Sequence, residues 1–224
     1  MSTRDIVMMG AGMPVERLTP ERRRGMTREA LVEAAADVFA RRGFQAASLD
    51  EIAESAGFTR GAIYSNFGGK EELLIAVLDV YTERQLREFG AAIDSVSEGT
   101  GEEQSAAAAA VWSHTRRDLN ITLLSLEMRL YALRNPDFRK RLAIAERRQQ
   151  GRIAEFIAHV AGTEGRQLRI EPADLAEILR AFSDGLGQLA TLDEERSDEY
   201  DRIAMTFFGM IAEAATPEEE SGKS

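Results

Sequence analysis

Apolar residues recur at three- and four-residue steps along most of the chain, and no segment shows the strict polar–apolar alternation of a half-buried strand. Residues 27–42 carry a typical apolar stripe, formed by Leu31, Ala34, Ala35, Val38 and Phe39. Thr27 is predicted to be the N-cap of this helix and Gly43 its C-terminal stop. The pattern therefore predicts an all-α fold with about nine helices.

Two short helices are predicted next, separated by a glycine turn. Ser48 and Glu51 have the spacing of a capping box, and Gly57 ends the first helix. Thr59 is a candidate N-cap for the second helix. The apolar anchors of this second helix are predicted to be Ile63 and Phe67.

Longer helices are predicted over the rest of the chain. One starts at Lys70, and another runs from the alanine-rich residues 106–110 to Asn135. The latter carries a leucine stripe with alternating four- and three-residue steps: Leu119, Leu123, Leu126, Leu130 and Leu133. Three further helices are predicted at 137–161, 172–192 and 199–215.

Composition and charge narrow the possible functions. The chain has no cysteine, which excludes disulfides and thiolate chemistry, and no apolar run is long enough for a membrane span. The net charge is −10, yet residues 1–70 hold ten Lys/Arg against nine Asp/Glu, so the acidity lies in the remainder. A soluble, cytoplasmic protein with a nucleic-acid-facing N-terminal part is compatible with this distribution.

The capped helix, glycine turn and short helix of residues 48–67 fit a helix-turn-helix, whose second helix lies in a DNA major groove. Thr59, Arg60 and Gly61 begin that helix, where free N–H groups favour phosphate, and Tyr64 lies on its outward side. Flanking phosphates could be held by Lys70 and by the two predicted N-caps, Thr27 and Ser48. An ordinary helical hairpin within a bundle is the alternative interpretation of the same pattern.

Residues 25–85 resemble the DNA-binding domain of the tetracycline-repressor (TetR) family. The resemblance lies in residues 34–78, AAADVFARRGFQAASLDEIAESAGFTRGAIYSNFGGKEELLIAVL, and above all in the glycine turn, Y-x-x-F and the following K-E-E-L. It implies contacts to double-stranded DNA from Thr27, Ser48, Thr59, Arg60, Gly61, Tyr64, Asn66 and Lys70. Asn66 is a departure, because the family often has histidine there.

The resemblance also implies a domain organisation: a basic leader at 1–24, the DNA-binding domain at 25–85, a ligand-binding and dimerisation domain at 86–216, and a polar tail at 217–224. A cavity for an unidentified small-molecule effector is implied, with candidate liners Trp112, His114, Met128, Tyr131, Phe156, His159 and Phe182. A homodimer is implied through the last two long helices, with candidate interface residues Leu175, Leu179, Phe182, Leu186, Leu189, Ile203, Phe207 and Met210.

The expected function is that of a sequence-specific transcriptional regulator, a repressor released from a palindromic operator by a small molecule. The alternative is an all-α interaction or small-molecule-binding module whose helix-turn-helix is only structural. No catalytic constellation, metal site or cofactor is predicted: GLGQLA at 185–190 falls in the middle of a predicted helix, where no dinucleotide-binding turn can form. The sequence does not identify the effector, the operator or the controlled genes.

Overall fold

The computed structural model describes residues 19–96, 100–116, 119–163 and 166–217, so the predicted leader up to residue 18 and the tail from residue 218 lie outside it. The all-α prediction is confirmed, with nine α-helices in the described part of the chain. They are α1 Pro20–Ala46, α2 Leu49–Ser55, α3 Arg60–Asn66, α4 Lys70–Asp94, α5 Gly101–Arg116, α6 Leu119–Arg134, α7 Pro136–Thr163, α8 Pro172–Leu192 and α9 Ser197–Ala214, with a 3₁₀ turn, η1, at Glu194–Arg196.

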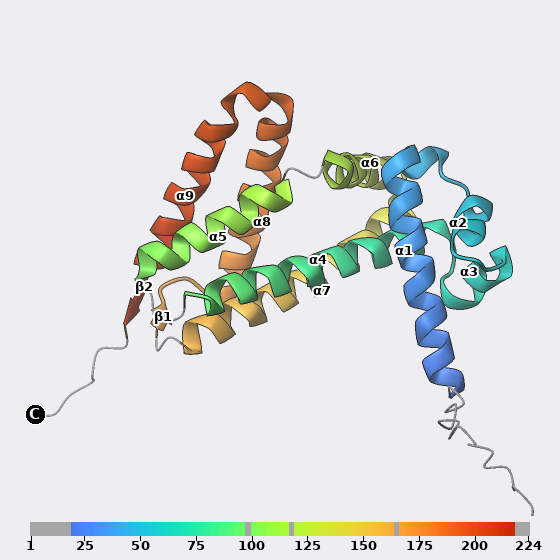
Figure 1. Cartoon of the computed structure of the whole chain (residues 1–224), viewed down its shortest axis with the longest axis horizontal. Helices are drawn as coiled ribbons and strands as arrows, with labels where there is room; N and C mark the ends of the chain where they lie inside the picture. The colour runs from blue at the N-terminus through green and yellow to red at the C-terminus, as the bar shows by residue number, and fades with distance from the viewer. Residues whose placement is uncertain (1–18, 97–99, 117–118, 164–165, 218–224) are drawn as a thin grey trace, which may run out of the picture.

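The helices form two groups joined by two long helices (Figure 1). α1, α2 and α3 pack together at one end, and α5, α8 and α9 form the arm at the other end. α4 and α7 run between the two groups, and α6 packs against α1. Within the described segments, no helix combines the length and apolar character that a bilayer crossing requires.

The first helix begins earlier than predicted. Its N-cap is Thr19, whose hydroxyl accepts a hydrogen bond from the Arg22 backbone amide at 3.2 Å, and Pro20 occupies the first helical position. Thr27 therefore lies inside α1, and its hydroxyl donates to the Arg23 carbonyl at 3.0 Å. The prediction of Thr27 as an N-cap is wrong, because Thr19 and Pro20 start the helix two turns earlier.

Two other expectations need correction. The predicted helix from 106 to Asn135 is two helices, α5 and α6, which pack in different parts of the molecule. Two three-residue strands, β1 Arg166–Leu168 and β2 Ala215–Pro217, pair antiparallel. Strands this short leave no readable period-2 pattern, so the sequence could not predict them.

The leucine stripe of α6 faces outward. Its five leucines are 40–68% exposed, whereas Leu124, Met128 and Ala132 on the opposite side are buried. These three buried residues belong to a core that extends from the α1–α4 group into α6 and α7. A second, smaller core lies in the arm and comprises Trp112, Leu186, Ala190, Tyr200 and Ala204.

A kink near the end of α1, at Gly43, connects the first group of helices with α6. Gly43 has φ 73° and ψ 164°, a conformation open essentially only to glycine. This geometry lets the Phe44 backbone amide donate to Glu127 Oε2 of α6 at 2.5 Å. A Cβ atom on residue 43 would lie 2.6 Å from Glu127 Oε1. Gly43 is therefore required by its backbone conformation, and a Cβ there would also displace the end of the Glu127 side chain.

We expect Gly43→Ala to lower the free energy of unfolding by more than about 2 kcal/mol, because it adds backbone strain and displaces the Glu127 carboxylate. Gly57→Ala is the matched control: Gly57 also has φ +73°, but an added Cβ there meets nothing within 4 Å. We expect the control to lower the free energy of unfolding by only about 1–2 kcal/mol. Urea unfolding followed by circular dichroism measures both; equal losses would contradict a role for the carboxylate.

Candidate nucleic-acid interface and internal cavity

The second helix of the predicted helix-turn-helix, α3, depends on its neighbours for its position. It has seven residues, fewer than an isolated helix needs to be stable in water. Ile63 is completely buried, and Phe67 at the end of the helix is 4% exposed. Both belong to the core shared with α1 and α2, so the two predicted anchors of this helix are confirmed.

Two arginines of α1 hold the C-terminal end of α3. Arg24 donates to the Ser65 carbonyl at 2.9 Å, and Arg28 donates to the Asn66 carbonyl at 3.1 Å. The Arg28 guanidinium also lies over the Phe67 ring, 4.2 Å from its centroid. The last carbonyls of a helix lack intrahelical partners and carry partial negative charge, so these cations stabilise the end of α3. The sequence-based prediction places Arg24 in the basic leader and gives Arg28 no role; the four-residue spacing of the two arginines on one face of α1 is the available signal.

The outward side of α3 carries four of the predicted DNA-contacting residues: Thr59, Arg60, Gly61 and Tyr64, all exposed. The Thr59 hydroxyl makes no capping hydrogen bond, so it keeps its hydrogen-bonding capacity. A Cβ on Gly61 would meet only Thr59 Oγ1, at an ordinary 3.6 Å. Neither backbone strain nor internal packing therefore explains a glycine at position 61.

Arg60 is held over this surface by two weak, exposed contacts. Its guanidinium donates to Tyr64 Oη and to Asp50 Oδ2, both at 3.2 Å. The hydrogen bond with Tyr64, followed by the charge of Asp50, raises the pKa of Arg60. An exposed ion pair contributes little free energy, so an incoming phosphate can replace Asp50 as the partner of Arg60.

Lys70 has a role inside the protein. Its ammonium donates to the Gln45 carbonyl at 3.1 Å and lies 4.8 Å from the centroid of the Phe44 ring. Burial lowers the pKa of Lys70, and the nearby charge of Glu127 partly opposes this shift. Lys70 thus ties the start of α4 to the last residues of α1, and only its remaining N–H groups are available for the predicted phosphate contact.

Two further predicted contacts are engaged within the domain. Asn66 Nδ2 donates to the Ala62 carbonyl at 2.8 Å and to Ser65 Oγ at 3.3 Å, and its Oδ1 is buried. Its amide N–H groups are therefore used within α3, and the predicted DNA contact from Asn66 would require them to exchange these partners for a phosphate. Ser48 is the N-cap of α2, as predicted, and accepts from the Glu51 amide at 3.0 Å.

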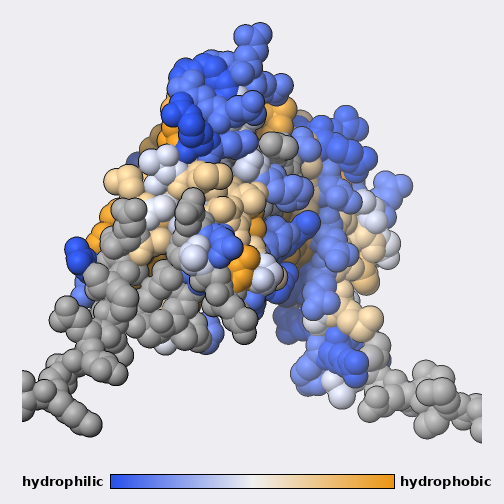
Figure 2. All heavy atoms as spheres, turned by 60° about the vertical axis from the view of Figure 1, so that its left-hand side comes forward, coloured by the Kyte–Doolittle hydropathy of each residue, from blue (hydrophilic) through white to orange (hydrophobic). Residues whose placement is uncertain are grey.

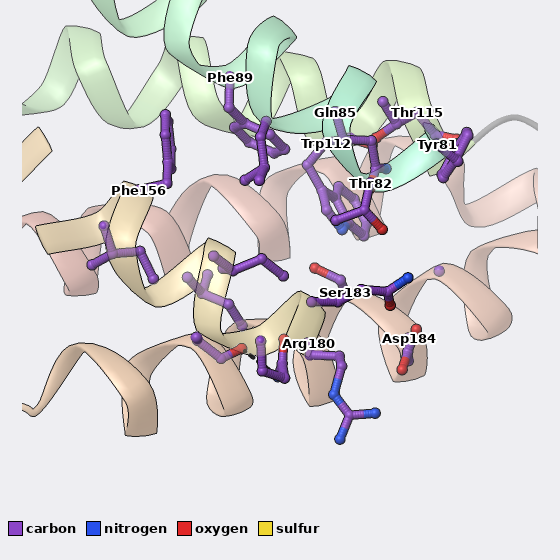
Figure 3. A pocket seen from close by; sticks show the side chains of 18 of the residues that line it. Tyr81, Thr82, Gln85, Phe89, Trp112, Thr115, Phe156, Arg180, Ser183 and Asp184 are labelled. Carbon is purple, nitrogen blue, oxygen red and sulfur yellow. Dashed lines mark hydrogen bonds between the residues drawn. The ribbon is translucent and has the colours of Figure 1, made fainter. Parts of the chain in front are cut away.

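A cavity of about 450 Å³ lies among α4, α5, α6, α7, α8 and α9 (Figure 3). Three of the predicted liners face it: Trp112, Met128 and Phe156. Most of the other liners are apolar, and the charged ones come from α6, α7 and α8. A cavity of this size and lining is typical of a small-molecule site.

The other predicted liners lie elsewhere. Tyr131 donates to Glu71 Oε1 at 2.7 Å, and this hydrogen bond raises the pKa of Tyr131. Phe182 stacks on Phe207 with ring centroids 3.7 Å apart and is not among the cavity liners. His114 and His159 are exposed. These four predictions were wrong because apolar spacing identifies a buried face without showing which neighbour covers it.

No group of His, Asp or Glu side chains in the described segments is arranged to hold a metal ion. The charged residues at the cavity are paired with one another instead. Arg129 donates to Asp184 Oδ2 at 2.5 Å, and Arg180 lies 3.9 Å from Glu146 and also pairs with Glu177.

The candidate dimer-interface residues are divided between the inside and the outside of the chain. Leu175 and Leu186 are buried within it, and Leu179 lines the cavity. The prediction that these three side chains lie on the outer surface of the dimerisation helices is therefore corrected. Leu189 and Met210 are 53% and 62% exposed. Phe182, Ile203 and Phe207 are half-buried. Other exposed apolar residues on α8 and α9 are Ile178, Leu192 and Met205.

Hydrophilic and hydrophobic residues occupy different parts of the arm's surface. In Figure 2, hydrophilic atoms cover the turn between α8 and α9 at the top, and hydrophobic atoms are visible on the arm below it. Exposed apolar side chains concentrated on two adjacent helices are typical of a protein–protein contact.

Two family models match most of the described chain. Residues 31–77 match the model described as bacterial regulatory proteins of the tetR family, and residues 101–211 match the C-terminal part of a BetI-type transcriptional repressor. The first match contains α2 and α3, and the second contains most of the cavity.

The chain is also similar to individual proteins, in sequence over a short segment or in fold over most of its length. The chain is 52% identical over 52 residues to the HTH-type transcriptional regulator SrpR of Pseudomonas putida, a match that spans 23% of this chain and 24% of SrpR. A TetR-family transcriptional regulator from Rhodococcus sp. has a TM-score of 0.66 and 21% identity over 84% of this chain and 99% of that one. A transcriptional regulator from Saccharomonospora viridis, solved in complex with choline, has a TM-score of 0.56 and 21% identity over 82% and 95% of the two chains.

We expect Asp184→Asn to lower the free energy of unfolding by about 1–2 kcal/mol, because it leaves the partly buried Arg129 without its counter-charge. Asp137→Asn is the matched control: Asp137 pairs with Lys140, and the two side chains are 95% and 78% exposed. The control should change stability by less than about 0.5 kcal/mol. Chemical unfolding of both variants is the measurement, and equal effects would show that the Arg129–Asp184 pair is not structurally important.

Proposed function

Because the chain belongs to the TetR family of bacterial regulatory proteins, we propose that it is a DNA-binding transcriptional regulator, a repressor that a small molecule releases from a palindromic operator. The match of residues 101–211 to a BetI-type transcriptional repressor supports the repressor assignment. The protein would act in the bacterial cytoplasm, bound to the nucleoid DNA when its cavity is empty.

The observation that carries the DNA-binding proposal is the outward side of α3. Thr59, Arg60, Gly61 and Tyr64 project from a helix that is fixed in place by its opposite side, and they make few contacts with the rest of the chain. An exposed helix N-terminus with a cation, an aromatic ring and no Cβ at its second position suits close approach to a phosphate backbone and to base edges.

A homodimer would supply the second recognition helix. Two α3 helices must lie about 34 Å apart, one helical turn of DNA, to read the two halves of a palindrome. The exposed apolar side of α8 and α9, which includes Leu189 and Met210, is the surface that we propose for this contact.

Release by a ligand needs a physical link between the cavity and α3, and α6 is positioned to supply it. Arg129 of α6 lines the cavity, and Glu127 of the same helix accepts the hydrogen bond from the Phe44 amide near the end of α1. We propose that a bound ligand favours a position of α6 in which the two recognition helices no longer match the operator spacing. The ligand can shift this equilibrium only by its different affinities for the two arrangements.

Arg60→Ala and Tyr64→Ala are each expected to weaken binding to DNA flanking the protein's own gene by about tenfold or more. Asp50→Asn should strengthen DNA binding, because the substitution removes the carboxylate that competes with phosphate for Arg60.

Wild-type affinity should fall roughly tenfold or more when the salt concentration is raised about fourfold, because counterions are released on binding. Fluorescence anisotropy with labelled duplexes measures all of these affinities.

Arg147→Ala is the control for these variants, since it removes an exposed positive charge from α7, far along the chain from α3. It should leave the affinity unchanged. If Arg60→Glu binds DNA as well as the wild type does, the helix-turn-helix is only structural and the protein is an all-α binding module.

For the dimer, Leu189→Glu is expected to convert the protein to a monomer, because it places a charge in an apolar contact. Val80→Glu on α4 is the control, because Val80 is 48% exposed and Leu189 is 53% exposed. The mass in solution, measured by analytical ultracentrifugation, should halve for the first variant only. A wild-type monomer at the concentrations that saturate DNA would contradict the proposed interface.

A further inference from the structure

The phenylalanines and the charged side chains of the cavity lie in different parts of it. In Figure 3, Phe89 and Phe156 lie toward one end, whereas Gln85, Ser183 and Asp184 lie toward the other. We propose that the cavity selects an elongated, uncharged amphiphile, with its apolar tail beside the phenylalanines and its polar group at the opposite end. This inference rests on the proposed function, in which the cavity holds the effector.

The charged side chains of the cavity argue against a charged ligand. Among the described residues that line it, four carry charge: Arg129, Glu146, Arg180 and Asp184. Their charges cancel, and each cation has an anionic partner, with Arg129 at 2.5 Å from Asp184 and Arg180 at 3.9 Å from Glu146. An ionic head group would either break one of these pairs or add an uncompensated charge beside apolar walls, and both cost free energy.

Uncharged hydrogen-bonding groups also line the cavity. The side chains of Gln85, Ser183 and Gln188 line the cavity, and none of them forms a hydrogen bond with another residue in the described part of the chain. Amide and hydroxyl groups both donate and accept, so they fit a hydroxyl, carbonyl or amide of a ligand. The ligand class that matches all of these groups is therefore polar but uncharged.

The rest of the cavity provides room and apolar contact. Phe89 of α4, Trp112 of α5 and Phe156 of α7 contribute aromatic surface, and the volume of about 450 Å³ suits a molecule of moderate size. Trp112 is the only tryptophan of the chain and is 4% exposed, so its fluorescence reports directly on what enters the cavity.

The test uses three probes of equal chain length and different head-group charge: decanol, decanoate and decyltrimethylammonium. Each is titrated into the full-length protein while Trp112 fluorescence is recorded. Decanol should bind at least about tenfold more tightly than either ion. If either charged probe binds as tightly as decanol, or if decanol does not bind, the proposal is overturned.

Two variants test whether the paired charges set this preference. Asp184→Asn leaves Arg129 uncompensated and should raise the affinity for decanoate about tenfold or more, but not that for the cationic probe. Arg129→Gln should raise the affinity for decyltrimethylammonium about tenfold or more, but not that for decanoate. Asp137→Asn, far more exposed and outside the cavity lining, should change neither affinity. Circular dichroism shows that each variant is folded, and unchanged selectivity in both cavity variants would refute the inference.

DNA binding by the probe-free protein separates this result from the proposed function. A protein that binds its operator but prefers a charged probe retains the regulator assignment and loses the ligand class. A protein that binds decanol selectively but no DNA loses the regulator assignment and retains the chemistry of its cavity.

Discussion

Among the contacts between the α1–α3 group and the rest of the molecule, the hydrogen bond from the Phe44 backbone amide to Glu127 depends on the backbone conformation of Gly43. Glu127 lies on one side of α6, and Arg129, two residues later, reaches Asp184 at the cavity on another side. A helix turn is rigid on this scale, so a shift at Arg129 is also a shift at Glu127. The cavity and the corner before α2 are thus connected by less than one turn of helix.

The surface of α3 is built on a helix that has little stability of its own. Seven residues cannot offset the cost of helix nucleation, so the position of α3 depends on Ile63 and Phe67 beneath it and on Arg24 and Arg28 at its end. Because these contacts lie on the inner side and at the C-terminal end, the N-terminal end remains open. The outward residues of α3 therefore contribute little to holding the helix in place.

Local patterns predicted most of the fold but not the tertiary partners of the candidate site residues. Capping and glycine signals located α2, α3 and the start of α4, since these depend on residues close in sequence. Tertiary partners could not be predicted in this way: Tyr131 pairs with Glu71, and Asn66 turns its amide back to its own helix. The apolar spacing of Leu175 and of the α6 leucines also could not show which stripe would be buried and which exposed.

Gly61 illustrates how stability and binding can favour different residues. Its surroundings are open, and alanine is better than glycine in a helix by about 1 kcal/mol. Selection for thermal stability alone, or a design procedure that scores the isolated chain, would therefore replace this glycine early. Substitutions chosen to raise stability would then alter the surface of α3 that is proposed to contact DNA. Gly61 should therefore be kept unchanged in any library of variants selected for stability.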